Sequence, residues 1–165
     1  MTTLRRLYYE YSTYHIISRG NNRQNILQNH EDKLSFLESL SNYKLRYSFK
    51  LFAFVLMDNH FHLIIETNPA HNISRVMQGI LLSYSNKFRR KYCYVGHVWQ
   101  GRFFSKVIQS EPQVIQNIEY IHNNPVRASM VRSCVEFSWS SACYYGGLPN
   151  SVIDKLIDIN RFGEI

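Results

Sequence analysis

The sequence is poor in the residues that mark several classes of protein. Its 165 residues include three cysteines, four prolines and seven glycines. An odd number of cysteines without CxxC spacing argues against a disulfide framework and against a cysteine-ligated zinc site. Scarce glycine and proline beside 45% hydrophobic residues exclude collagen-like, low-complexity and disordered chains. We therefore expect one globular domain over residues 1–165, with its core at about 14–145 and an extension at about 146–165.

Long hydrophobic runs are absent as well. The longest stretch without a polar residue, Leu51–Met57, has seven residues, whereas a membrane-spanning helix needs about 20. The first residues, 1–6, contain no apolar core of a signal peptide. Together with the cysteine pattern, these features predict a cytoplasmic protein without a membrane partner.

Acidic residues are missing from one long segment. None occurs between Glu66 and Glu111, although cations and aromatic residues continue through it. Cations attract phosphate and aromatic rings stack on unpaired bases, so this segment indicates a nucleic-acid partner. The alternative is that the cations lie on a solvated helix face and the aromatic residues lie in the core. Composition alone favours neither interpretation over the other. The cations of the segment are Arg75, Lys87, Arg89, Arg90, Lys91, Arg102 and Lys106.

Hydrophobic periodicity predicts an α+β fold. Strands are expected at 14–18, 49–57, 60–66 and 103–108, and helices at 31–46, 73–91 and 111–124, with Asn72 as an N-cap. A further short helix is expected in the tail, at 152–159. The order βαββαβα predicts an antiparallel sheet with helices packed on it, compatible with a ferredoxin-like or RRM-like sandwich.

Two histidines on the expected third strand are candidate metal ligands. His60 and His62 flank Phe61. Because side chains alternate across a strand, both imidazoles point the same way, about 6–7 Å apart, and can reach one divalent ion. Taken alone, however, a short HxH pattern is more often two half-exposed strand histidines that make hydrogen bonds.

The last predicted helix carries a tyrosine away from its apolar stripe. On a wheel of 100° per residue, Tyr120 lies almost opposite the isoleucine and valine side chains of residues 114–121. Asn124 projects from the same face as Tyr120 and offers a carbonyl oxygen. The alternatives are an exposed surface tyrosine and, for Asn124, a helix C-cap before Pro125; the cap would not exclude a ligand role.

If that helix crosses the histidine face, these groups form a metal-assisted phosphoryl-transfer site. A cation would polarise a phosphate oxygen and neutralise developing charge. A tyrosine hydroxyl, with an ordinary pKa of about 10, needs in-line placement and a nearby positive charge to act as a nucleophile. Two imidazoles and one amide oxygen suit Mg²⁺ or Mn²⁺, and geometry alone does not exclude Zn²⁺.

Several segments resemble motifs of the single-tyrosine transposases. Residues 60–62, within 54–64, look like their HUH motif (histidine, bulky hydrophobe, histidine). Residues 119–126 resemble their tyrosine helix, with the Tyr-x-x-x-Asn-Pro-Val ending typical of REP-associated tyrosine transposases. Further matches in family order are at 18–23, 98–103 and 139–141. The resemblance spans about 14–145 and implies a single HUH transposase domain.

The resemblance implies a role for each candidate residue. His60 and His62 would be metal ligands for Mg²⁺ or Mn²⁺, and Asn124 the third ligand, although relatives often carry glutamine there. Tyr120 would attack single-stranded DNA near an imperfect hairpin, become joined to the 5′ phosphate and leave a 3′ hydroxyl that can later rejoin strands without ATP. Relatives include obligate dimers and members that act as monomers, so a homodimer and a monomer both stay open.

Candidates for DNA contact lie before the acid-free segment and within it. A protein with such contacts would be associated with the nucleoid when it is bound to DNA. For Trp99, a place in the core is at least as strongly favoured as a role as a base platform. The candidates are Arg19, Arg23, Lys87, Arg89, Arg90, Lys91, Trp99 and Arg102.

Two other functions stay open at this point. A non-catalytic single-strand binder of similar architecture would need only the basic and aromatic groups, and has no use for an intact set of metal ligands and tyrosine. A metal-dependent hydrolase that activates water would turn over without a tyrosine adduct, and nothing in the sequence specifically favours it.

Overall fold

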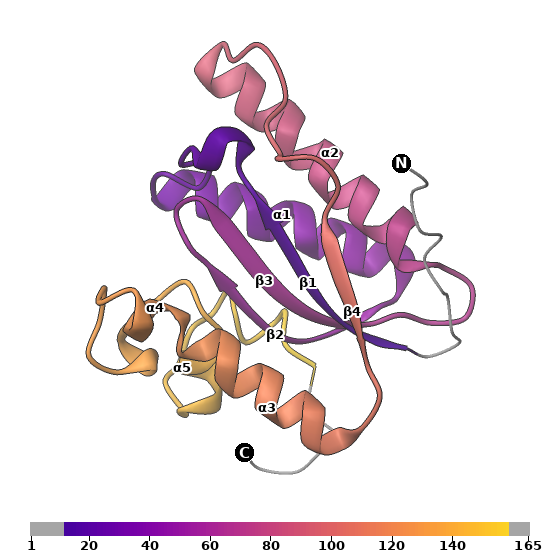
Figure 1. Ribbon diagram of the computed structural model, residues 1–165, viewed down its shortest axis with the longest axis vertical. Helices are drawn as coiled ribbons and strands as arrows, with labels where there is room; N and C mark the ends of the chain where they lie inside the picture. The colour runs from indigo at the N-terminus through magenta and orange to yellow at the C-terminus, as the bar shows by residue number, and fades with distance from the viewer. Residues whose placement is uncertain (1–11, 159–165) are drawn as a thin grey trace.

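Four antiparallel strands form one sheet in the order β2-β3-β1-β4 (Figure 1). The computed structural model describes residues 12–158. The α+β fold class expected from the sequence is confirmed. The strands are β1 (Thr13–Arg19), β2 (Lys50–Leu56), β3 (His60–Glu66) and β4 (Phe104–Ile108).

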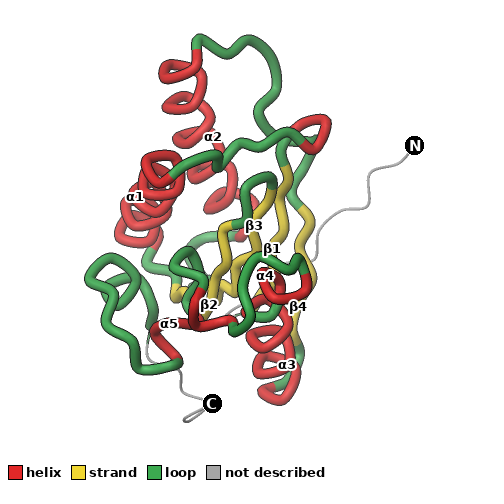
Figure 2. The backbone as a smooth tube through the Cα atoms, turned by 90° about the vertical axis from the view of Figure 1, so that its left-hand side faces the viewer, coloured by secondary structure: helices red, strands yellow, loops and turns green. Residues whose placement is uncertain are grey.

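Helices cover both faces of the sheet, as Figure 2 shows in side view. The two long helices, α1 (His30–Tyr47) and α2 (Ile73–Tyr92), pack on one face, and α3 (Glu111–His122) lies across the other. Within residues 12–158, no helix combines the length and hydrophobicity that crossing a bilayer would need. The shorter elements are η1 (Asn21–Arg23), α4 (Asn124–Arg127), η2 (Cys134–Glu136) and α5 (Ala142–Tyr145).

Alternation along the strands divides the core into two apolar layers. Phe61, Leu63 and Ile65 of β3 are fully buried against α1 and α2. Ile64 points the other way and packs with the apolar stripe of α3. Because neighbours in a strand face opposite sides, the same alternation directs His60 and His62 toward α3.

Local signals at the helix ends agree with the sequence. The Asn72 side chain accepts a hydrogen bond from the backbone N–H of Arg75 at 2.9 Å, which confirms the expected N-cap of α2. α3 begins after Ser110 and carries Pro112 in its first turn. It ends at His122, slightly before the expected boundary, because the chain turns at Asn123 into the separate helix α4.

The C-terminal part runs along the edge of β2. The backbone N–H of Leu56 donates to Trp139 O at 2.8 Å, and Val55 forms a bridge with Ser140. The short helix expected at 152–159 is wrong over its described part, where residues 151–156 form turns; residue 159 lies outside the described residues. After these turns, the backbone N–H and the carboxylate of Asp158 both bond the backbone of Leu51.

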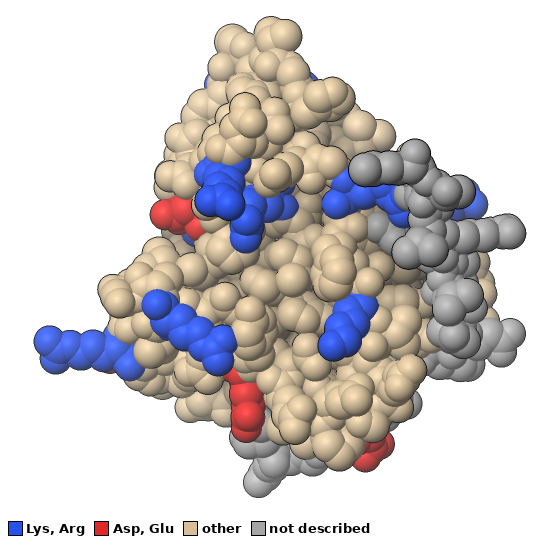
Figure 3. Space-filling model, in the orientation of Figure 1, with Lys and Arg blue, Asp and Glu red and all other residues tan. Residues whose placement is uncertain are grey.

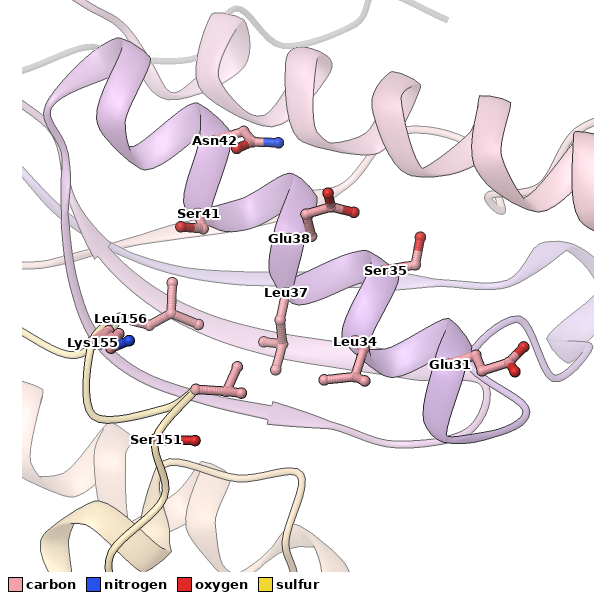
Figure 4. A pocket seen from close by; sticks show the side chains of 11 residues that line it. Glu31, Leu34, Ser35, Leu37, Glu38, Ser41, Asn42, Ser151, Lys155 and Leu156 are labelled. Carbon is pink, nitrogen blue, oxygen red and sulfur yellow. The ribbon is translucent and has the colours of Figure 1, made fainter.

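A cavity of about 660 Å³ lies between α1 and these C-terminal turns (Figure 4). Leu34, Leu37 and Leu156 line it, and Glu38 and Lys155 are among its polar neighbours. None of the sequence-predicted site residues lines this cavity. It is therefore separate from the histidines and Tyr120.

Candidate active site

The two HxH histidines lie side by side on β3. Their ring centroids are 5.3 Å apart, and both rings project toward α3 while Phe61 between them is fully buried on the opposite side. His62 is 4% exposed and His60 is half-buried. Strand alternation therefore produces the paired imidazoles that the sequence predicted.

Each of these histidines has its Nδ1 atom in a hydrogen bond. His60 Nδ1 lies 2.6 Å from Asn59 Oδ1, and His62 Nδ1 lies 2.9 Å from Nε2 of a third histidine, His15. An amide oxygen only accepts, so His60 carries its proton on Nδ1 and keeps an unprotonated Nε2. Ligand histidines in metal sites are typically held in this way by their second ring nitrogen.

Sequence reasoning missed His15. Alternation in β1 places it on the face opposite Tyr14 and Ile16, which the sequence does indicate. Its neighbour on β3 depends on the register of the two strands. Ile17 pairs with His62, so His15, two residues earlier on the same face of β1, lies diagonally across from His62. That register comes from the tertiary fold, so no local pattern could reveal the contact.

Tyr120 lies on α3 with its ring over the histidines. Ring centroids are 6.0 Å apart for Tyr120 and His62 and 6.1 Å apart for Tyr120 and His15, both in edge-on geometry. The side chain is 42% exposed, so its hydroxyl is accessible to a large substrate. The structure thus brings together Tyr120, His60 and His62, whose chemical roles stay predictions.

Cations surround this group. Arg127 of α4 places its guanidinium 4.8 Å from the Tyr120 ring centroid, a contact that the sequence analysis did not foresee. In the strand register, Arg19 pairs with His60 and Lys106 pairs with His15. Figure 3 shows Lys and Arg side chains around the middle of this face, with acidic side chains toward its left and lower margins. The arrangement favours an anionic ligand.

The environment keeps the three imidazoles neutral. Burial lowers the pKa of His62 to about 3, and the positive charges of His15, His60 and Arg19 add to the effect. Burial and Arg19 lower the pKa of His60. Burial also lowers the pKa of His15, with Lys106 adding to this and a hydrogen bond with Asn117 opposing it. Neutral imidazole is the form that binds metal ions.

Asn124 caps the end of α3. Its Nδ2 donates to the carbonyl oxygens of Tyr120 at 3.1 Å and Ile121 at 3.4 Å, so Oδ1 is the atom left for another ligand. Among residues 12–158, no group of three or more His, Cys, Asp or Glu side chains is placed to hold a metal ion together. A cation would therefore be held by the Nε2 atoms of His60 and His62, with the third ligand role of Asn124 still a prediction.

The turn that carries Asn59 is fixed by a neighbouring loop. The N–H of Gly20 donates to Asn59 O at 2.8 Å, and the buried Lys33 Nζ lies 2.7 Å from Asp58 Oδ1. A Cβ atom at Gly20 would overlap the carbonyl oxygen of Gln24, so this close approach requires glycine. These contacts position Asn59 and, through it, the His60 ring.

The predicted DNA contacts divide into exposed and engaged side chains. Arg19, Arg23, Arg90 and Arg102 are exposed. Lys87, in contrast, pairs with Glu38 at 2.7 Å. Lys91 pairs with Glu31 and Asp32 at 2.9 and 2.8 Å, and the Arg89 guanidinium donates to Gly96 O. Carboxylates of α1 thus neutralise part of the positive charge of the acid-free segment. The ion pairs of Lys87 and Lys91 join α2 to α1.

Trp99 lies in the core. It is 9% exposed, and its ring packs against Phe36, Phe61 and Tyr84 at centroid distances of 6.3, 5.5 and 5.8 Å. Its indole N–H donates to Leu81 O at 3.2 Å. The structure corrects the expectation of a base-stacking platform at this position and favours the core alternative.

Comparison with known proteins identifies the family. Residues 8–124 match the family model described as "Transposase IS200 like", which covers more than half of the chain. The chain belongs to the IS200-like transposase family. The match ends at Asn124, so it includes His15, His60, His62 and Tyr120.

Individual relatives agree with this assignment. A Haemophilus influenzae protein named as a REP-associated tyrosine transposase is 25% identical over 107 residues, which are 58% of this chain and 60% of that protein's own length. A solved REP-associated tyrosine transposase bound to a REP hairpin superposes with a TM-score of 0.77 at 21% identity, covering 99% of this chain and 96% of the other. A Deinococcus radiodurans chain described as a transposase gives 0.52 at 18% identity, over 72% and 97% of the two chains. At these identities, the two structures establish the fold alone.

Proposed function

We propose that this member of the IS200-like family cleaves and rejoins single-stranded DNA beside hairpins, with Tyr120 as the nucleophile. One observation carries the proposal: an accessible phenol lies over His62, next to His60, while Arg127 stacks on its ring. A tyrosine kept for packing would be buried, and a pure DNA-binding surface needs no paired neutral imidazoles beside it.

In the proposed reaction, the Tyr120 oxygen attacks a DNA phosphorus atom. The Tyr O–P bond forms, the P–O3′ bond breaks, and the departing oxygen takes up a proton to become a 3′ hydroxyl. The phenol proton passes to solvent. One phosphodiester is exchanged for another, so a 3′ hydroxyl can reverse the step and release Tyr120. Arg127 and Arg19 supply positive charge beside the phenol and the phosphate.

The residues fit a divalent cation. His60 offers an unprotonated Nε2, the Nε2 of His62 lies outside its bond with His15, and Asn124 offers Oδ1. Bound Mg²⁺ or Mn²⁺ would supply polarisation of a non-bridging phosphate oxygen. All of these groups come from one chain, so cleavage in this proposal needs no second copy, and a homodimer would serve another purpose.

Two basic loops give the DNA a place to bind. The N–H of Asn21 donates to Val98 O and the N–H of Gln100 donates to Arg19 O, so the loops at 19–23 and 98–102 lie side by side. They carry the exposed Arg19, Arg23 and Arg102. A hairpin ligand is supported by the solved relative that is bound to a REP hairpin. We propose that these arginines contact the hairpin backbone.

The test is adduct formation on hairpin-bearing single-stranded DNA with Mn²⁺. The wild type is expected to give a covalent protein–DNA species on denaturing gels that retains the label on the 3′ side of the cut, and Tyr120→Phe to give none. Tyr43→Phe, on α1 and on the other side of the sheet, is the matched control. No adduct from the wild type, or an equal adduct from Tyr120→Phe, contradicts the proposal. Metal-independent binding unchanged by His60→Ala, without an adduct, would instead identify a non-catalytic binder.

A further inference from the structure

A third histidine supports the pair on β3 from the neighbouring strand. His15 on β1 is 6% exposed, and its Nε2 lies 2.9 Å from His62 Nδ1. The two ring centroids are 5.2 Å apart with an interplanar angle of 32°. Both rings are buried beneath Tyr120, where water does not compete for this hydrogen bond.

Asn117 of α3 is a second polar neighbour of His15. Its Nδ2 donates to the backbone carbonyl oxygen of Gln113 at 2.7 Å, which leaves Oδ1 to face other donors. The interaction with this amide opposes the burial that lowers the pKa of His15, as an amide oxygen beside a ring N–H does. Because His15 Nε2 faces His62, Nδ1 is the ring nitrogen left to carry that N–H.

These contacts favour one direction for the hydrogen bond between the two histidines. A neutral imidazole has one N–H and one lone pair, so an N–H on His15 Nδ1, toward Asn117, leaves His15 Nε2 as an acceptor. The proton between His15 and His62 then belongs to His62 Nδ1. The unprotonated atom of His62 is then Nε2, which matches the state that Asn59 imposes on His60.

We propose that His15 and Asn117 are positioning residues that hold His62 in the tautomer protonated at Nδ1, so that its Nε2 is available to a divalent cation. The proposal rests on the proposed function for the identity of that cation. The tautomer itself is a property of the protein alone. Residues that hold a metal-binding histidine by a hydrogen bond to its other ring nitrogen typically change metal affinity by about 10–100-fold.

The direct test is ¹⁵N NMR of the imidazole rings in the metal-free protein. The His62 signals, assigned by their loss in His62→Gln, are expected to show the proton on Nδ1. Asn117→Ala is expected to shift them toward a mixture of the two tautomers. Asn123→Ala is the matched control, because Asn123 makes the same type of bond to a carbonyl one turn back but faces solvent. A proton on Nε2 of His62 in the wild type would overturn the proposal.

The second test is the dissociation constant for Mn²⁺, measured by electron paramagnetic resonance. His15→Ala is expected to raise it about 10–100-fold. His15→Gln, whose amide oxygen can accept from His62 Nδ1, is expected to restore most of the affinity, and both variants must keep the wild-type circular dichroism spectrum. An unchanged constant in His15→Ala would overturn the proposal.

The two tests separate this inference from the proposed function. A wild-type protein that binds no Mn²⁺ contradicts the metal-dependent part of the proposed function, and the NMR result then decides the tautomer by itself. The opposite result is also distinguishable. If the wild type binds Mn²⁺ and forms the Tyr120 adduct, the proposed function stands. If both properties are unchanged in His15→Ala and His62 is protonated at Nε2, the role of His15 and Asn117 is contradicted.

Discussion

The phenol ring of Tyr120 stands nearly at right angles to the imidazole of His62, at an interplanar angle of 75° and a centroid distance of 6.0 Å. The two residues belong to different elements, α3 and β3, which pack through Ile64, Val114 and Ile118. The apolar contact between helix and sheet therefore sets the distance between the candidate nucleophile and the candidate metal site. The predictions below concern the charges, hydrogen bonds and packing around this pair.

Stability is expected to fall with decreasing pH because of the buried histidines. The pKa of His62 is lowered by burial to about 3 and that of His122 to about 4, whereas both take up protons near pH 6.5 in the unfolded chain. Below that pH the unfolded state binds more protons, so each residue costs up to about 1.4 kcal/mol of unfolding free energy per pH unit until its folded pKa is reached. Urea unfolding at pH 7, 6 and 5 measures this slope.

The contribution of His62 can be isolated by difference. His62→Gln is expected to lose less stability than the wild type between pH 6.5 and 5. The slope of its unfolding free energy against pH should be smaller by the equivalent of roughly one proton, which is about 1.4 kcal/mol per pH unit. His30→Gln, which removes an exposed histidine of α1, is the control. Equal slopes for wild type and His62→Gln would show that His62 titrates normally in the folded protein.

Removal of Arg127 is expected to weaken the site without unfolding it. Arg127→Ala takes the guanidinium from the Tyr120 ring, and the loss of one charged contact to phosphate costs about 1.5–3 kcal/mol, which is roughly 10–100-fold in adduct formation rate. Arg132→Ala, an exposed arginine in the segment between α4 and η2, is the control. The measurement is the initial rate of adduct formation, and an unchanged rate in Arg127→Ala would remove Arg127 from the site.

DNA binding is expected to weaken steeply with salt through the two paired loops. Arg102→Ala and Arg23→Ala should each reduce the slope of log affinity against log salt concentration by about 0.7–0.9, the values for one phosphate contact in single-stranded and in duplex DNA. Lys91→Ala should leave the slope unchanged, because Lys91 is paired with Glu31 and Asp32, and should lower the thermal midpoint instead. Fluorescence anisotropy at several salt concentrations measures the slopes. A reduced slope in Lys91→Ala would place DNA on α2.

Trp99 is expected to contribute to stability and not to DNA affinity. Trp99→Leu leaves a gap among Phe36, Phe61 and Tyr84 and should cost about 2–4 kcal/mol of unfolding free energy. The affinity of the folded protein for single-stranded DNA should stay within about twofold of wild type, since the ring is buried in the core. A base-stacking role would instead show as an affinity loss of about 1–3 kcal/mol with little change in stability.

Much of the candidate site could be predicted because its pattern is local. Alternation along β3 places His60 and His62 on one face whatever the strand pairs with, and the wheel of α3 sets Tyr120 apart from its apolar stripe. The Asn72 cap and the start of α3 after Ser110 likewise follow from neighbouring residues. The tail was predicted less well, because it forms turns that attach to β2 through Asp158 and Leu51, a distant contact that no local pattern reveals.

The chain's own order of residues thus determined the α+β fold class, the paired imidazoles and the displaced tyrosine, since each depends on periodicity within one element. Only the tertiary structure decided which groups surround them. The register of β1 beside β3 brings His15 to His62, the turn at Asn123 brings Arg127 over Tyr120, and the packing of α1 on α2 neutralises Lys87 and Lys91. These contacts join residues far apart in the sequence, and their partners are selected by burial and strand pairing, which leave no signal within either segment alone.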